Sequence, residues 1–202
     1  MTKIIGLTGR SGAGKSVACD IFAKHGIPSI DTDAVYHDLL LQQGPCTEEL
    51  RAAFGDRILD SQGLVDRKKL AEAVFGKENT PALLHTLNAI THKYIMAKTH
   101  EHVLAYAKNG APAVLIDAPL LFEAEVHKEC DLVLGILAPR TLCVDRITER
   151  DQISEDRAHM RLDAQKDNTF FKEHCTAIIE NNGDLQALEH AICQFLKEYG
   201  LG

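Results

Sequence analysis

The most constraining feature of this chain is a phosphate-binding motif close to its start. Residues 9–16 read Gly-Arg-Ser-Gly-Ala-Gly-Lys-Ser, which is the G-x-x-x-x-G-K-S pattern of a P-loop. Its glycines permit backbone conformations in which successive N–H groups turn toward a phosphate chain. Lys15 is expected to reach the β- and γ-phosphates, and the Ser16 hydroxyl to bind Mg²⁺. We therefore expect nucleotide contacts from Ser11, Gly12, Ala13, Gly14, Lys15, Ser16 and Val17.

The residues around this motif have the pattern that a P-loop requires. Residues 3–8 form a short, mostly apolar segment typical of a buried strand. After the motif, Val17, Ile21 and Lys24 follow one another at helical spacing. This order places a helix start, with its positive dipole end, at the phosphate site. The alternative, an ordinary glycine-rich turn, explains neither the complete motif nor its setting.

Length and composition limit the class of protein. A chain of 202 residues that is 45% apolar and 25% charged fits one domain with a normal core. The formal net charge of −7 argues against general nucleic-acid binding, which needs a basic surplus. No apolar run approaches the roughly 18 residues of a membrane-spanning helix, and no signal-peptide pattern is visible. The six cysteines are scattered, which predicts reduced thiols and a cytoplasmic location.

Alternating strand and helix patterns predict an α/β fold. Short apolar runs predict strands at about residues 3–8, 27–31, 112–117, 131–137 and 176–180. Helices between them imply a five-stranded parallel sheet with helices on both faces. Pro139 is expected at the first position of one helix, and Ser154 and Asp184 as the N-caps of two others. The last helix should run to Tyr199 and stop at Gly200.

A mostly helical stretch at residues 45–110 interrupts this alternation. Within it, the run from residue 81 predicts either one bent helix or two helices. We interpret residues 45–110 as an insertion into a single unit whose core comprises residues 1–44 and 111–202. In a P-loop kinase such an insertion holds the second substrate, and the alternative is structural padding; the sequence leaves both open.

Carboxylates follow two of the predicted strands. Asp31 and Asp33 lie at the carboxyl end of the second strand, where open α/β sheets bind their ligands. Asp33 can accept the proton of an attacking hydroxyl, or it can serve as the N-cap of the following helix. Asp117 ends the third strand, where a carboxylate can hold Mg²⁺ directly or through water.

Two arginines are candidates for the positive charge that phosphoryl transfer needs. Arg146 and Arg150 are four residues apart and therefore share one face of a helix. A guanidinium binds phosphate through two hydrogen bonds and can stack on a base. Residues 146–161 are interpreted as a short lid, and the alternative is a salt-bridged surface helix. The turn at Asn181 and Gly183 can contact a purine edge or be a plain strand-to-helix turn.

Together these motifs resemble those of the dephospho-coenzyme A kinase family. In chain order, the matches are G-L-T-G-x-x-G-x-G-K-S at 6–16, D-x-D at 31–33, P-L-L-[FV]-E at 119–123, R-x-x-x-R-D at 146–151, R-[IL]-x-x-Q at 161–165 and N-N-G at 181–183. The similarity extends over residues 4–198. It departs at His37, where the family usually has Arg, and at Lys93 after His92, where it commonly has Pro.

The resemblance implies a three-layer P-loop kinase fold and a reaction. ATP, with Mg²⁺, would phosphorylate the ribose 3′-hydroxyl of dephospho-coenzyme A in the last step of coenzyme A biosynthesis. Asp33 would be the general base, and Lys15 and Arg150 would stabilise the transferring group. Arg146 and the turn with Asn181 and Gly183 would lie near the adenine.

Alternative functions stay open at this point. Another small metabolite or a nucleoside monophosphate can be the acceptor, although Asp33 favours a hydroxyl, since a phosphate acceptor has no proton to remove. A nucleotide switch would need an N-K-x-D motif, which the sequence lacks. An inactive relative disagrees with intact Lys15, Ser16 and Asp33. No membrane or nucleic-acid partner is expected, and the sequence does not indicate the oligomeric state.

Overall fold

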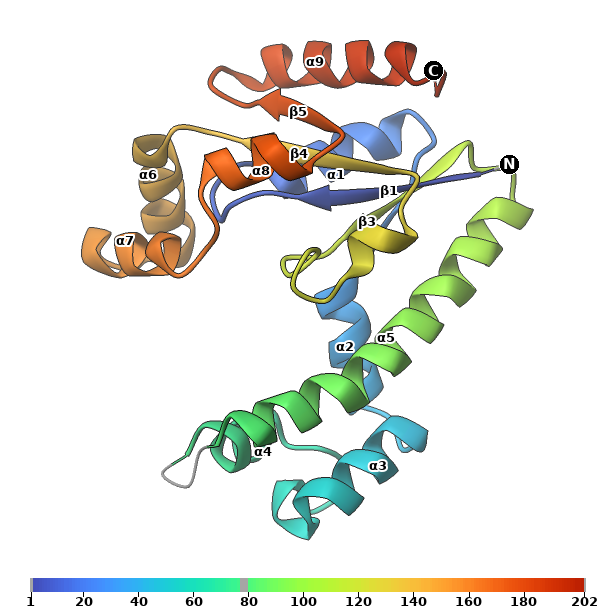
Figure 1. Cartoon of the computed structure of the whole chain (residues 1–202), viewed down its shortest axis with the longest axis vertical. Coiled ribbons are helices and arrows are strands. Elements are labelled where there is room, and N and C mark those ends of the chain that lie inside the picture. Colours follow the sequence, from blue (N-terminus) through green and yellow to red (C-terminus); the bar gives the residue numbers. More distant parts are fainter. Residues whose placement is uncertain (1, 77–79, 202) are drawn as a thin grey trace. The chain divides into compact units, whose positions relative to one another are not determined.

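The computed structural model describes residues 2–76 and 80–201 (Figure 1). These residues form two compact units. The first consists of Met1–Ile30 and Val103–Gly202, and the second of Asp31–His102. Each unit has its own hydrophobic core. The sequence predicts a division by function, into a kinase core, an acceptor-binding insertion and a lid. The two compact units do not test that division, and it stays a prediction.

A five-stranded sheet forms the centre of the first unit. Its strands are β1 (Lys3–Thr8), β2 (Ser29–Asp31), β3 (Ala113–Asp117), β4 (Leu132–Leu137) and β5 (Ala177–Glu180). Their order is β2-β3-β1-β4-β5, and β1 pairs in parallel with both β3 and β4, as β4 does with β5. Each strand ends at the predicted residue and begins at most two residues later than predicted, which confirms the sheet.

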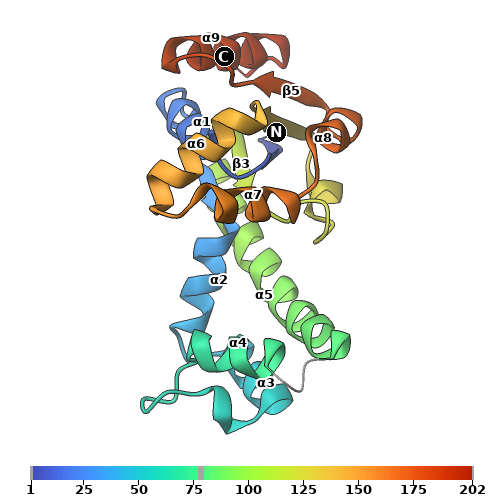
Figure 2. The same ribbon diagram turned by 90° about the vertical axis from the view of Figure 1, so that its left-hand side faces the viewer.

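Helices cover both faces of this sheet, as predicted. They are α1 (Lys15–Lys24), α6 (Arg140–Asp151), α7 (Glu155–Asp163), α8 (Asn168–His174) and α9 (Leu185–Glu198), with a 3-10 helix η2 (Val126–Glu129). Ile5 and Leu7 of β1 are buried in one core with apolar residues of α1 and α9. Gly6, on the opposite face, approaches Leu121 and Cys130. Helices α1 and α8 lie on opposite sides of the sheet (Figure 2).

The helix boundaries of the first unit follow the predicted signals with two exceptions of one residue each. Ser154 accepts a hydrogen bond from the Arg157 N–H and Asp184 one from the Ala187 N–H, so both are N-caps. Helix α9 ends at Glu198, one residue before the predicted Tyr199, which is its C-cap. Pro139 was expected inside α6 but is its N-cap, because its ψ of 143° is still extended.

The second unit is helical, as the sequence predicts for most of it. It contains α2 (Thr32–Leu40), α3 (Pro45–Phe54), the 3-10 helix η1 (Asp56–Ile58), α4 (Arg67–Phe75) and most of α5 (Pro81–Lys108). Leu50, Ile58 and Val74 are fully buried in its core. Residues 81–108 form one helix of 28 residues rather than two. In the described part of the chain, no helix is both long and apolar enough to cross a membrane.

The contact between α1 and α9 should be a main source of stability in the first unit. Phe22 is fully buried, and its ring meets Phe195 edge to face with centroids 6.0 Å apart. Phe22→Ala should lower the free energy of unfolding by about 3–5 kcal/mol, because it leaves a cavity. Urea unfolding measures this. Leu104→Ala, at a side chain that is 69% exposed, is the control and should change it by less than about 0.5 kcal/mol; equal losses would contradict the prediction.

Candidate active site

The P-loop follows β1 and ends where α1 begins. Gly9, Gly12 and Gly14 have φ angles of 141°, 78° and 100°, a region that other residues rarely adopt. A Cβ on Gly9 would lie 2.2 Å from the carbonyl oxygen of Ile136, and one on Gly14 would lie 2.3 Å from Nδ2 of Asn181. The loop therefore packs so closely against β4 and the turn after β5 that these positions need glycine.

A pocket of about 570 Å³ opens over the loop, within the first unit. This volume is in the range of roughly 300–1,000 Å³ that is usual for small-molecule sites. Ala13, also predicted to bind nucleotide, is fully buried and does not line the pocket, and its nucleotide contact stays a prediction. The lining combines the other predicted loop residues with Arg10 and part of α6: Arg10, Ser11, Gly12, Gly14, Lys15, Ser16, Val17, Arg146, Glu149 and Arg150.

The cations of the pocket lie along the loop. Nζ of Lys15 donates a hydrogen bond to the carbonyl of Gly9 at 3.2 Å. Nη1 of Arg146 donates one to the carbonyl of Gly12, also at 3.2 Å. Arg150 adds a further guanidinium group to the lining, against a single carboxylate, Glu149; Arg10 also lines the pocket, but its side chain is buried. The pocket therefore concentrates positive charge in a chain whose formal net charge is −7, as phosphate binding requires.

Arg150 is held by its neighbour in the chain. Its Nε and Nη2 donate to the two carboxylate oxygens of Asp151 at 2.7 and 2.9 Å. Arg161 of α7 pairs with the same carboxylate. Hydrogen bonds from Arg150 and then Arg161 hold the pKa of Asp151 well below its usual range. Arg150 therefore forms the salt bridge that the alternative interpretation of this helix predicts, whereas Arg146 contacts the P-loop.

Asn181 lies behind the loop. It is only 6% exposed, and its Nδ2 donates to the carbonyl of Ala13 at 2.8 Å. Its own N–H donates to the carbonyl of Leu137, the last residue of β4. Gly183 lies two residues further on and is exposed. Asn181 therefore fixes the back of the P-loop, and the predicted contact of this turn with adenine stays a prediction.

Two contacts of the loop were not expected from the sequence. Nη2 of Arg10 donates to the carbonyl of Leu162 in α7 at 2.5 Å. The N–H of Ser11 donates to Oε1 of Gln165 at 3.0 Å. Gln165 is the last residue of the R-[IL]-x-x-Q motif at 161–165, whose pattern alone indicates no role for it. Arg10 stands at a position that the P-loop pattern leaves free, so no signal in the pattern indicated its contact.

In the second unit, Asp31 is the N-cap of α2. Its Oδ1 accepts hydrogen bonds from the N–H groups of Asp33 at 2.8 Å and Ala34 at 3.2 Å. Asp33 belongs to the first turn of the helix and is exposed. The suggestion that Asp33 is the cap is therefore wrong. The reason is that the helix begins at Thr32, two residues before the start that a cap at Asp33 would require, so Asp31 occupies the capping position.

The oxygen atoms available near the loop fit a magnesium ion. Ser16 is the second residue of α1, and Asp117 pairs with Leu7 at the end of β3, next to the strand that carries the loop. Burial and then the charge of Asp117 raise the pKa of the Cys19 thiol of α1 to about 12. No cluster of three or more His, Cys, Asp or Glu side chains suited to a metal occurs among residues 2–76 and 80–201. Mg²⁺ does not need one, because it commonly takes one or two protein oxygens and completes its shell with phosphates and water.

The packing behind the loop predicts an intolerance to any side chain at Gly14. Gly14→Ala should lower the affinity for ATP by at least about tenfold, which corresponds to about 1.4 kcal/mol. The reason is that the new methyl would collide with the Asn181 amide and displace the loop. Titration with a fluorescent ATP analogue measures the affinity.

Gly26→Ala is the matched control for this variant. Gly26 also has a positive φ, 74°, but a Cβ there has no atom within 4 Å. It should therefore cost stability without changing ATP affinity. Equal affinities of the two variants would show that the loop does not depend on its contact with Asn181.

Comparison with known proteins identifies the family. The model of the dephospho-CoA kinase family matches residues 3–187. A dephospho-CoA kinase from Moorella thermoacetica is 36% identical over 190 residues, which cover 94% of this chain and 88% of that protein; one from Arabidopsis thaliana is 33% identical, covering 97% and 83%. A crystal structure of a Thermus thermophilus protein is similar with a TM-score of 0.81 at 30% identity, covering 98% of this chain and 97% of that one. This chain therefore belongs to the dephospho-CoA kinase family.

Proposed function

We propose that this protein transfers the γ-phosphoryl group of ATP to the ribose 3′-hydroxyl of dephospho-coenzyme A, giving coenzyme A and ADP. This is the last step of coenzyme A biosynthesis. The observation that carries the proposal is one positively charged pocket that joins the P-loop to the arginines of α6, in a chain of this family. Phosphoryl transfer suits such a pocket because its catalysis is mainly positioning and electrostatic stabilisation.

The nucleotide is proposed to bind along the loop. Phosphate oxygens replace the Gly9 carbonyl as acceptors for Lys15, while the N–H groups of Gly12, Gly14, Lys15 and Ser16 face the phosphates at the start of α1. The N–H groups of Ser11 and Ala13 are not available, because Gln165 and the carbonyl of Arg10 accept them. Ser16 and Asp117 would hold Mg²⁺, which neutralises charge developing on the β- and γ-oxygens. Arg146 lies beside Gly12 and is proposed to reach the nucleotide from α6.

Arg150 is proposed to stabilise the transferring group while Asp151 still holds it. The guanidinium has five N–H donors. Asp151 takes hydrogen bonds from Nε and Nη2, so Nη1 and one further N–H of Nη2 can bind a phosphoryl oxygen. A guanidinium fixed in advance loses little freedom when it binds, which favours transition-state stabilisation.

The acceptor is proposed to bind to the second unit. Asp33 accepts the proton of the 3′-hydroxyl as its oxygen attacks the γ-phosphorus, and so acts as the general base. His37 stands where the family usually has Arg, but Nη1 of Arg67 lies 3.5 Å from Nδ1 of His37. A guanidinium is thus present beside that position, and we propose that it contacts a phosphate of the acceptor.

Two further points belong to the proposal. Lys93 replaces the Pro that the family commonly has after His92. It continues α5, and its Nζ pairs with Glu49 at 2.5 Å.

All six cysteines are free thiols, which supports a reducing, cytoplasmic location.

Release of ADP from Mg-ATP tests the function. With the wild-type protein, ADP should form with dephospho-coenzyme A, and coenzyme A should be the phosphorylated product. Nucleoside monophosphates and a reaction without acceptor are run beside it. Lys15→Ala is the control and should abolish release, because the β- and γ-phosphates lose their point charge. Release with another acceptor only, or release that Lys15→Ala retains, would overturn the assignment.

Asp33 can be tested as a base by removing its charge. Asp33→Asn should lower turnover by on the order of 10²-fold or more, as loss of a general base does, and ATP affinity should not change. Steady-state kinetics and a binding titration measure the two quantities. Asp38→Asn makes the same exchange at an exposed position of the same helix and should have no effect. Unchanged turnover in Asp33→Asn would exclude a role as base.

A further inference from the structure

Arg10 is a residue of the P-loop whose side chain is withdrawn from solvent. It is 8% exposed, and its Nη2 bonds to the carbonyl of Leu162 at 2.5 Å. Leu162 lies in the last turn of α7, where main-chain carbonyls carry partial negative charge that attracts a cation. Nε of Arg10 is buried and has no hydrogen-bond partner among the described residues. Burying a charged group with one N–H donor unpaired costs free energy, so a buried guanidinium of this kind is expected to have a structural or functional role.

A second bond joins the loop to the same end of α7. The N–H of Ser11 donates to Oε1 of Gln165, which lies two residues beyond the helix. Two consecutive loop residues are therefore tied to residues 162–165, although about 150 residues of chain separate them. The bonds come from a side chain and from the backbone, so a shift of the loop moves both.

Helix α7 is also connected to the pocket through Asp151. Arg161, next to Leu162, pairs with Asp151. Asp151 in turn holds Arg150 through two hydrogen bonds, and Arg150 lines the pocket. The contacts thus form a chain from the P-loop through α7 and Asp151 to Arg150, which lines the same pocket as the loop.

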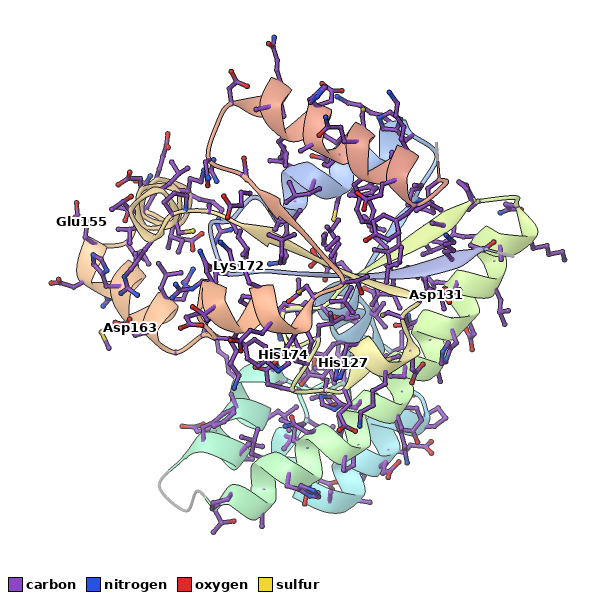
Figure 3. All side chains as sticks on the ribbon, turned by 45° about the horizontal axis from the view of Figure 1, so that its top comes forward. His127, Asp131, Glu155, Asp163, Lys172 and His174 are labelled. Carbon is purple, nitrogen blue, oxygen red and sulfur yellow. The ribbon has the colours of Figure 1, made fainter. Side chains whose placement is uncertain are left out.

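Attachment of α7 to the rest of the unit does not require Arg10. Ala158 and Leu162 are fully buried. Arg140 pairs with Asp163 at 2.8 Å, and its Nη2 lies 3.0 Å from Nδ1 of His159. Figure 3 labels Glu155 and Asp163, the first and last residues of α7. Apolar packing and the Arg140 contacts therefore hold the helix, and the contact of Arg10 serves something else.

We propose that Arg10 is a positioning residue that couples the phosphate loop to helix α7. Phosphates bound to the loop and the arginines bound to Asp151 are then placed as one unit, so that Arg150 meets the γ-phosphoryl group. The proposal rests on the proposed function, since it gives Arg10 a part in that reaction. It predicts coupling in both directions, because a nucleotide that fixes the loop must also fix α7.

The experiment measures this coupling in the full-length protein by hydrogen exchange of residues 155–163. A non-hydrolysable ATP analogue with Mg²⁺ should slow exchange there in the wild type. Arg10→Met keeps an unbranched stem but removes the charge and the donors, and in it the analogue should no longer slow exchange. Its kcat should fall about tenfold while KM for ATP changes less than about threefold, because an interaction of the transition state is lost.

Arg140→Met is the matched control. It removes the contacts with Asp163 and His159 without touching the loop, so exchange of α7 should rise with and without nucleotide. The slowing by the analogue, and kcat, should remain. Arg10→Lys, which keeps the charge and a donor, should recover part of both readouts, and it decides the question where Arg10→Met does not fold.

Retained nucleotide-dependent slowing and retained kcat in Arg10→Met would overturn the proposal. So would an equal loss of kcat in Arg140→Met, because the effect would then be general loosening of α7. Failure of the proposed function is distinguishable: wild-type protein would not phosphorylate dephospho-coenzyme A, whereas the exchange measurement needs no acceptor.

Discussion

The site depends on the fact that the carbonyl groups of the P-loop are bound from behind or from the side. Those of Gly12 and Ala13 accept hydrogen bonds from Arg146 and Asn181. An uncovered carbonyl would repel a phosphate, so each of these bonds makes the loop a better anion site. The two donors come from α6 and the turn after β5, so the loop depends on both elements.

The sheet order explains why these elements can meet there. β1, which leads into the loop, lies in the centre with β4 beside it and β5 next to β4. The segments that follow β4 and β5, which carry Arg146 and Asn181, therefore start beside the loop. Glycine makes the approach possible, because a Cβ on Gly12 would lie 2.6 Å from the carbonyl oxygen of Cys143 in α6. The sheet order and the glycine backbone of the loop together allow α6 and the turn after β5 to contact the P-loop.

The sequence predicts those features that depend on local pattern. Strand ends, the N-caps Ser154 and Asp184 and the P-loop were all correct, because each is set by neighbouring residues. Asp31 is the cap that was suggested for Asp33, since both carboxylates follow the strand and the pattern does not distinguish a helix that begins at Thr32 from one that begins two residues later. The bonds of Arg10 to Leu162 and of Asn181 to Ala13 join residues 152 and 168 positions apart, and no local pattern contains them. For the same reason, the sequence could not tell that Asn181 faces the loop.

The positive charges of Arg150 and Arg161 are partly neutralised by one carboxylate, that of Asp151. Arg150 and Arg161 would repel each other without Asp151 between them. Their hydrogen bonds hold the pKa of Asp151 well below its usual range, which favours its ionised form. The three groups together carry one positive charge, in a geometry that is fixed before any ligand binds. A chain with a net charge of −7 can in this way present a local positive pocket to a polyanion. The free energy needed to bring the cations together is spent when the protein folds, so it does not add to the barrier of the reaction.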